Sequence, residues 1–385
     1  MTVVDSPEKT LFVSTTQSFL QKEAPLARVR ELHAAGVSFD PVWWRRAAEL
    51  GWTGLLVPAE LGGGSVSESG VADLATVAEL LGKTVAPGPL YPVSVVLTAL
   101  AGSADSQAHA SVIESLISGE TVASWAVSEP GRGWAPLDPS VTATAADAGY
   151  RLDGTKDRVE AGAQSAMLLV VARCGDEIRQ FLVPTDAPGV RIEPQQSVDL
   201  VKQYARVHFD GVVVDPSAAV GSAAETAALI DRQSQIAQVL QCAEVVGVVQ
   251  TVFDFTVQWA LDRHTFGRPL ASYQALKHGF ADMKLWLEAC RATTAAAVTD
   301  VADRSPVAGL SASIAKSYVG ETAGRIVQGC VQMHGGIGVT WEHDLHLYLR
   351  RVSLYRSLFG TPEEHNLRVY DAEKAGRAGT GRATR

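Results

Sequence analysis

The sequence predicts an α+β protein of several domains, in which a helical part, a β part and a second helical part follow one another. Over residues 6–118, apolar side chains recur three and four residues apart, which is typical of amphipathic helices. Beyond Gly119, six short runs of alternating or β-branched residues are separated by Gly, Pro and Asp, as in a small β barrel or sandwich. From Glu225 to Asp262 no proline interrupts the helical pattern, and such a helix spans roughly 55 Å.

Further helical patterns follow the long one and predict a C-terminal helical bundle. The last ten residues, GRAGTGRATR, are small and basic, which favours disorder. The predicted parts are an N-terminal α-helical domain at residues 1–119, a middle β-barrel domain at 120–221, a C-terminal bundle at 222–375 and a disordered tail at 376–385.

Composition excludes several classes of partner. The chain has 385 residues, of which 33 are basic and 42 acidic, and its net charge of -9 includes no basic stripe, which argues against nucleic acid or an anionic membrane surface. The N-terminus lacks a secretory pattern and no run of eighteen apolar residues occurs, so neither export nor membrane insertion is expected. Four cysteines without CxxC spacing indicate reduced thiols and a cytoplasmic protein.

Two strings in the last third carry the residue types that a dinucleotide needs. RHTFGRPLASYQ ends the long helical stretch with a cation, an aromatic residue and a glycine turn, and then opens a new helix with an amide. QMHGGIG places an amide before two glycines, where a ligand can approach the backbone closely. Arginine binds phosphate well, and amides bind heterocycles. The candidate contacts are Arg263, Phe266, Gln274, Gln332, Gly335 and Gly336.

These strings resemble the flavin-binding signatures of the acyl-CoA dehydrogenase family, and the resemblance extends from about Val42 to Asp371. SEPGRG, with Ser128, is similar to the family's flavin strand, and GTPEEH, with Thr361, is similar to its closing segment. The resemblance implies a middle β barrel between an N-terminal helical domain and a C-terminal four-helix bundle. It also implies a tetramer with FAD at its interfaces, an acyl-CoA substrate, β-oxidation-like catabolism and an electron-transfer flavoprotein as acceptor.

The family's catalytic base is not in its usual place. Most members carry a glutamate just before the Gly-Thr of the closing segment, and this chain has Phe359 there. A minority carry it on the long helix before an arginine, a place held here by Asp231. Asp231 is thus the candidate base, although a position near a helix start would favour its charged form and lower its basicity. The alternative is that Asp231 is a solvated acid that only favours the helix.

Other departures from the family cluster around the flavin ring. Arg158 and Glu160 replace an aromatic residue and a threonine that pack behind the ring, and Trp134 replaces a small serine. Glu363 replaces a glutamine in the closing segment. The residues resembling those that hold the ADP half, which in the family reach across a subunit interface, are all present.

Three hypotheses follow from this division. The chain is one subunit of a heteromeric, steroid-type acyl-CoA dehydrogenase, whose related partner supplies the ring pocket and the glutamate. A variant of this hypothesis makes the chain a non-catalytic subunit that clamps the ADP half of FAD for a catalytic partner. Alternatively, it is a self-sufficient homotetramer in which Asp231 works. In the third hypothesis, Arg158 and Glu160 redirect the site to flavin chemistry other than dehydrogenation, or the site binds no flavin at all.

The remaining polar residues are interpreted as structural. His343 and His346 have spacing that suits a metal on one helix face, but no third ligand lies nearby, so no metal site is predicted. Four amides on the long helix are expected to satisfy one another or the backbone: Gln233, Gln235, Gln238 and Gln241. Arg350 and Arg351 are expected to form ion pairs on a helix face.

Overall fold

The computed structural model describes residues 6–380, which form two compact units that are described separately. The first unit contains the described residues up to Thr16 together with Arg28–Leu74 and Pro87–Ala237. The second contains Gln17–Ala27, Ala75–Ala86 and the described residues from Gln238 onward. Four helices contribute to both units: α1 (Pro7–Glu23), α2 (Leu26–Ala34), α4 (Gly70–Thr84) and α7 (Ala223–Asp262).

The helices of the first unit are short and begin and end at recognisable signals. In α3, the side chain of Asp40 accepts a hydrogen bond from Val42 N at 2.8 Å, and Pro41 occupies the first helical position, where its missing N–H costs nothing. α5 is almost entirely buried and apolar. Besides the shared helices, this unit contains α3 (Pro41–Glu49), α5 (Leu90–Gly102) and α6 (Ala110–Ile117).

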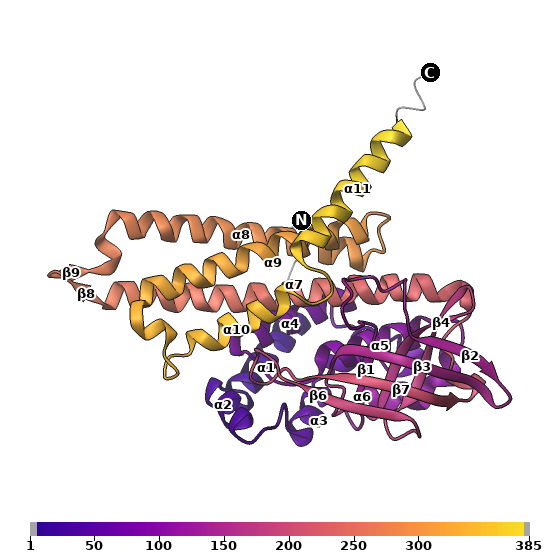
Figure 1. Cartoon of the computed structure of the whole chain (residues 1–385). Helices are drawn as coiled ribbons and strands as arrows, with labels where there is room; N and C mark the ends of the chain where they lie inside the picture. Colours follow the sequence, from indigo (N-terminus) through magenta and orange to yellow (C-terminus); the bar gives the residue numbers. More distant parts are fainter. Residues whose placement is uncertain (1–5, 381–385) are drawn as a thin grey trace. The chain divides into compact units, whose positions relative to one another are not determined.

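The first unit also contains a seven-stranded sheet (Figure 1). Side chains of its strands form most of an apolar core. Its order is β1-β4-β2-β3-β7-β6, with β5 paired to β4. The strands are β1 (Ala123–Ala126), β2 (Thr142–Ala146), β3 (Gly149–Glu160), β4 (Met167–Cys174), β5 (Glu177–Pro184), β6 (Val190–Gln195) and β7 (Tyr204–Val214). The pattern of short runs gave six strands and omitted β3, which lies between β2 and β7 in the sheet.

Strand β3 is irregular, and its irregularity bears on the site. Its pairing with β7 shifts register between Leu152 and Gly154 and again between Lys156 and Val159. Arg158 lies within the second shift and has a φ of 51°, an uncommon value for a residue with a side chain. Such a bulge re-aims side chains, so Arg158 does not follow the alternation of a regular strand.

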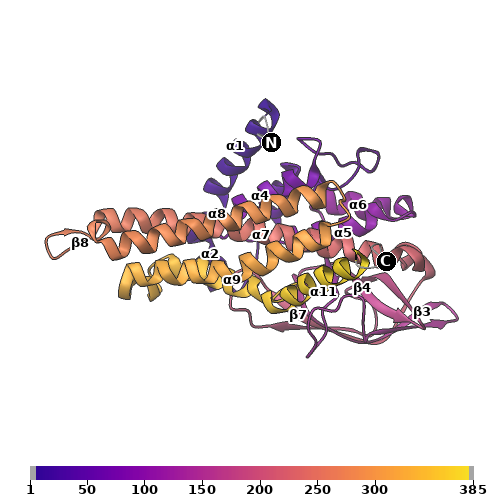
Figure 2. The same cartoon turned by 90° about the horizontal axis from the view of Figure 1, so that it is seen from above.

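The second unit is a helical bundle, as predicted. Figures 1 and 2 show α8 and α9 running alongside the later part of α7. Gly82 and Gly247 allow α4 to approach α7 closely, because a Cβ at Gly82 would lie 2.0 Å from Glu244 O and one at Gly247 would lie 1.9 Å from Glu79 O. The later helices are α8 (Gln274–Ala302), α9 (Ala308–His334), α10 (Leu345–Arg356) and α11 (Pro362–Thr380).

The bundle interior contains an ion pair whose burial the sequence pattern did not predict. Arg351 was expected to form an ion pair on a helix face, and it does pair with Glu244, but both residues are buried. Tyr355 donates its hydroxyl to the same carboxylate at 3.0 Å, and Arg351 Nη2 donates to Val85 O at 3.3 Å. A buried charge that is paired and hydrogen-bonded is tolerated, whereas one that has lost its partner is costly.

Three expectations about the ends, helices and thiols can be compared with the structure. The predicted tail at 376–385 remains a prediction, since α11 continues to Thr380 and residues 381–385 lie outside the described part of the chain. Of the described helices, α7 is long and apolar enough to cross a membrane, but 89% of that apolar stretch is buried in the protein. All four cysteines are free thiols.

Candidate cofactor site

The first predicted string folds into a β hairpin at the end of the bundle. It lies beyond the adjoining ends of α7 and α8 in both views (Figures 1 and 2). Strands β8 (His264–Thr265) and β9 (Arg268–Pro269) flank Phe266 and Gly267, whose φ values of 51° and 80° suit a two-residue hairpin turn. Phe266 is 94% exposed. A large aromatic side chain held out in this way is suited to contact a ligand or another subunit.

The hairpin is braced by Tyr273, the residue before α8. Its hydroxyl donates to Thr265 O at 2.8 Å, and the Arg268 guanidinium lies 3.9 Å from the centre of its ring. Arg263 follows α7 directly and is exposed, and Gln274 is the exposed first residue of α8. The turn therefore holds its candidate contacts at the surface.

The second predicted string ends α9 at the same end of the bundle. A Cβ on Gly279 of α8 would lie 3.0 Å from the Met333 side chain, so the start of α8 packs beside the end of α9. Gln332, Gly335 and Gly336 are exposed, and an added Cβ at either glycine would meet no atom within 4 Å. Open backbone of this kind leaves room for a ligand. The six candidate residues therefore share what we call the bundle end: Arg263, Phe266, Gln274, Gln332, Gly335 and Gly336.

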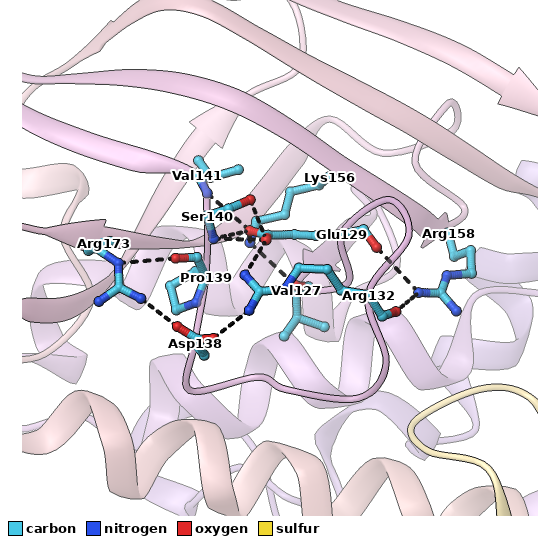
Figure 3. A network of polar contacts seen from close by, with 10 residues as sticks. All are labelled: Val127, Glu129, Arg132, Asp138, Pro139, Ser140, Val141, Lys156, Arg158 and Arg173. Atoms are coloured by element: carbon cyan, nitrogen blue, oxygen red, sulfur yellow. Dashed lines mark hydrogen bonds and ion pairs between the residues drawn. The ribbon is translucent and has the colours of Figure 1, made fainter. Parts of the chain in front are cut away.

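The flavin strand predicted around Ser128 leads into a loop, residues 128–141, that is tied to the sheet by a buried carboxylate (Figure 3). Glu129 accepts hydrogen bonds from Ser140 N at 2.8 Å, Val141 N at 3.0 Å and Lys156 Nζ at 2.7 Å. Burial alone would raise the pKa of Glu129, but Lys156 and these hydrogen bonds lower it to about 2. Burial lowers the pKa of Lys156 to about 8, against the attraction of Glu129.

Further charges fasten the same loop, which we call the Ser128 loop. Arg173 Nη2 donates to Asp138 Oδ1 at 2.6 Å, and Arg132 pairs with the same carboxyl group. Arg158, from strand β3, donates from Nη2 to Arg132 O at 3.2 Å and to Glu129 O at 3.5 Å (Figure 3). The Arg158 side chain therefore lies against the backbone of the loop, where the family resemblance places an aromatic residue facing the flavin ring.

The other three ring-half departures also make contacts within the protein, and one of them, Glu363, pairs with Arg356. Glu160 is buried and lies 3.1 Å from Lys202 Nζ, which also donates to Gly88 O at 3.0 Å. Trp134 packs edge-on against Trp125, with ring centres 5.9 Å apart. Because Glu160 is neutralised by its own lysine, no free carboxylate is offered to a ligand at this position.

Asp231, the candidate base, differs from expectation in its electrostatics. It lies about two turns beyond the first residue of α7, Ala223, and a helix dipole acts mainly within the first turn. Desolvation raises the pKa of Asp231, although Gln235 donates to its Oδ2 at 2.7 Å. The expectation that the helix dipole lowers the basicity of Asp231 is therefore wrong, because the pKa of Asp231 is raised. Its side chain remains exposed.

Three of the four helix amides find hydrogen-bond partners, and Gln233 and Gln238 bond backbone carbonyls as predicted. Gln235 bonds Asp231, and Gln233 accepts from Gln180 Nε2 at 2.9 Å and donates to Val95 O at 3.2 Å. Gln238 donates to Phe359 O at 3.3 Å. Gln241 is the exception, because neither of its buried amide atoms has a hydrogen-bond partner among the described residues.

The closing segment is held by the fold. Phe359 has a φ of 54°, and its carbonyl oxygen also accepts a hydrogen bond from His365 Nε2 at 3.0 Å. Thr361 and Glu364 form a capping box at the start of α11, with Thr361 N donating to the carboxylate at 2.7 Å and Glu364 N donating to Oγ1 at 3.3 Å. The Thr361 hydroxyl, a predicted cofactor contact, is thus already engaged in a helix cap.

The predicted absence of a metal site remains an expectation. Within residues 6–380, no three His, Cys, Asp or Glu side chains gather as metal ligands. His343 precedes α10, which begins at Leu345, so it does not share a helix face with His346.

Comparison with known proteins identifies the family. Acyl-CoA dehydrogenase models match the chain with their N-terminal domain at residues 6–120, their middle domain at 124–212 and their C-terminal domain at 230–372. The chain belongs to the acyl-CoA dehydrogenase family. This is a family of flavin-dependent oxidoreductases, and its N-terminal helical domain, middle β half-barrel and C-terminal helical domain are the fold that the sequence predicted.

Individual relatives cover almost the whole chain. The acyl-CoA dehydrogenase IpdE2 of Mycolicibacterium smegmatis is 28% identical, over 96% of this chain and 99% of that protein. The Tcur3481–Tcur3483 steroid ACAD is 27% identical with a TM-score of 0.85, over 96% of this chain and 98% of that one. The ChsE4–ChsE5 complex of Mycobacterium tuberculosis, 24% identical with a TM-score of 0.85 over 97% and 99%, shares the fold.

The two halves of FAD, the family's cofactor, fit this chain unequally. At the bundle end, Arg263 offers an exposed guanidinium, and Gly335 and Gly336 offer open backbone, as a diphosphate and adenosine require. Around the Ser128 loop, Arg158 and Glu160 are engaged by the protein itself. The residues present therefore fit the ADP half and do not fit the isoalloxazine ring.

Proposed function

We propose that this chain is one subunit of a heteromeric acyl-CoA dehydrogenase, and that its bundle end completes a FAD site whose ring pocket belongs to a related subunit. One contrast carries the proposal. The cationic and aromatic groups of the bundle end are exposed, whereas Arg158 and Glu160 of the ring half bond to the chain itself. A subunit with this division can hold the ADP half of a partner's cofactor without forming a ring pocket of its own.

The reaction assigned to the assembly is α,β-dehydrogenation of a CoA thioester. When bound, FAD would supply an acceptor for the β hydrogen as hydride, and a carboxylate would take the α proton. In this proposal the partner supplies that carboxylate, because position 359 is phenylalanine here. This chain contributes Arg263 toward the diphosphate, with Gln274, Gln332 and the two glycines around the nucleotide. Phe266, which is almost fully exposed, is covered by the partner.

The relatives support a heteromer and suggest the substrate class. The Tcur3481–Tcur3483 steroid ACAD pairs two chains and is named for a steroid, and IpdE2 is an acyl-CoA dehydrogenase. We therefore propose a bulky, steroid-type acyl-CoA as substrate, a tetramer of two kinds of subunit, a place in β-oxidation-like catabolism and an electron-transfer flavoprotein as acceptor.

Expression with and without a partner tests the proposal. The chain is purified alone and together with each acyl-CoA dehydrogenase-like chain of the same organism that carries the glutamate before Gly-Thr, and FAD is counted per chain by absorbance. We expect little or no FAD on the chain alone and one FAD per pair of unlike chains in the complex. One FAD per chain in a homotetramer that bleaches with an acyl-CoA would overturn it.

A homotetramer with Asp231 as base is the second candidate, because desolvation raises the pKa of Asp231 toward that of a useful base while its side chain stays exposed. Asp231→Asn distinguishes the two. The homotetramer predicts a loss of kcat of about 100-fold or more, whereas the heteromer predicts no change. Asp254→Asn is the matched control, since Asp254 is an exposed α7 carboxylate bonded by Gln250 four residues earlier, at 2.8 Å.

A further inference from the structure

A cluster of aromatic rings and histidines lies directly beside the bundle end. The ring of His334, the last residue of α9, stacks on Trp259 of α7, with centres 5.1 Å apart and planes 22° apart. His343, from the segment before α10, meets His334 at 4.7 Å, and Phe255 lies 5.6 Å from His334 and 5.9 Å from His343. His334 is therefore enclosed by three rings, and only 6% of its surface is exposed.

A hydrogen bond fixes the orientation of the His334 ring. Its Nδ1 lies 2.9 Å from Cys330 O, and a carbonyl can only accept, so Nδ1 carries the proton. Burial lowers the pKa of His334, which keeps the ring neutral near pH 7. His343 is held from the other direction, because its Nδ1 accepts a hydrogen bond from Leu345 N at 3.1 Å.

Trp259 connects this cluster to the candidate phosphate ligand. Arg263 N donates to Trp259 O at 2.9 Å, and the Arg263 guanidinium lies 5.9 Å from the Trp259 ring. That distance is within the range of a cation–π attraction. The indole Nε1 of Trp259 is buried and has no hydrogen-bond partner among the described residues. Thus Trp259 has one face against His334, a cation near its ring and one unused donor.

We propose that His334 and Trp259 form a stacked pair that positions the Arg263 guanidinium for the diphosphate of FAD, with His343 holding His334 in place. This inference rests on the proposed function, since it concerns the same ADP-half site. His334 is a positioning residue that acts through Trp259 and Arg263. Holding a long side chain near its bound geometry saves the entropy of ordering it on binding, which is equivalent to a change of about 3- to 10-fold in affinity.

The test compares FAD with riboflavin, which lacks both the diphosphate and the adenosine. The co-expressed complex is stripped of flavin, and both flavins are titrated by fluorescence quenching. His334→Ala is expected to weaken FAD binding by about 3- to 10-fold while riboflavin binding stays unchanged. His334→Phe keeps a ring to stack on Trp259 and is expected to restore FAD affinity. His346→Ala is the matched control, because His346 stacks on the exposed Trp341 at 4.9 Å nearby.

The outcomes separate this inference from the proposed function. If the unaltered complex binds FAD but His334→Ala binds it equally well, or loses FAD and riboflavin affinity alike, the positioning role is wrong and the proposed function stands. If the unaltered complex binds no FAD, the proposed function itself fails. Should His334→Ala not give a soluble complex, Trp259→Leu removes the other member of the stack, and the same FAD-specific loss is expected.

Discussion

The Ser128 loop and the bundle end both carry arginines beside glycines, yet only the arginine of the bundle end is available to a ligand. Around the loop, Arg132 pairs with Asp138 and Arg158 bonds backbone carbonyls. At the bundle end, Arg263 stands exposed near a tryptophan ring. The comparison teaches that residue type alone does not define a phosphate or flavin site. A cation that is already bonded within the fold stabilises the fold, and the same cation left exposed can bind.

The largest effect is expected from breaking the buried pair that fixes the loop. Glu129→Gln leaves buried Lys156 without its counter-charge, which should lower the free energy of unfolding by about 3–5 kcal/mol. Urea unfolding of the chain in its complex measures the change. Glu120→Gln, at an exposed glutamate shortly before β1, should stay within about 0.5 kcal/mol. Equal effects of the two substitutions would show that the pair does not hold the loop.

As the pH falls, the closing segment around His365 should be destabilised at a higher pH than the Ser128 loop. His365 is fully buried, and burial lowers its pKa from 6.5 to about 4, so the unfolded state binds more protons between these values. The stability due to neutral His365 is therefore complete above pH 6.5 and falls by about 3 kcal/mol as the pH drops to 4. Glu129, with a pKa lowered to about 2, loses its contribution only as the pH falls from 4.5 toward 2.

Hydrogen exchange at pH 7 and pH 5 measures this order. Residues 359–368 should lose protection at pH 5, while residues 129–141 keep it. His365→Gln should make the protection of the closing segment less dependent on pH, and His278→Gln, at an exposed histidine of α8, should not. If the Ser128 loop loses protection at a higher pH than the closing segment does, the assignment of the two transitions to His365 and Glu129 is wrong.

The sequence predicted the long helices and most of the strands, but it did not predict which side chains contact one another. The long helix was expected at Glu225–Asp262 and is Ala223–Asp262, because an unbroken helical pattern needs no distant partner to be recognised. Strand β3 escaped the pattern because two register shifts and Gly154 break its alternation. The expected domain limits at 119, 221 and 375 remain predictions.

Long-range contacts account for what was missed at the site. Arg158 was noticed as an unusual residue, but its bonds to a loop about 26 residues away depend on a bulge that no local pattern specifies. The stack of His334 on Trp259 joins residues from two helices and gave no signal beyond the histidine's place in QMHGGIG. Local strings can therefore locate a cofactor site, whereas the choice between binding and internal pairing is made by tertiary packing.

A smaller effect is expected at the exposed side of the comparison. Arg263→Ala should weaken FAD binding to the complex by about 10- to 100-fold, since a hydrogen bond to a charged group contributes roughly 1.5–3 kcal/mol. The free energy of unfolding of the Arg263→Ala variant should change by less than about 0.5 kcal/mol because the Arg263 side chain is exposed. Titration of the flavin-free complex measures the affinity. Arg325→Ala, at an exposed arginine of α9 paired with Glu321, is the control, and an equal loss there would refute a specific contact.

The smallest effect concerns Thr361, which the family resemblance gives to the cofactor and the structure engages in a helix cap. Thr361→Ala removes one half of the capping box and should cost about 1 kcal/mol of unfolding free energy. Glu364→Ala removes the other half, so the double variant should lose less than the sum of the two, as expected for residues in contact. Flavin titration completes the test. If Thr361 serves only the cap, FAD affinity is the same in both variants, whereas a loss confined to Thr361→Ala would return this hydroxyl to the cofactor site and narrow the difference between the two regions.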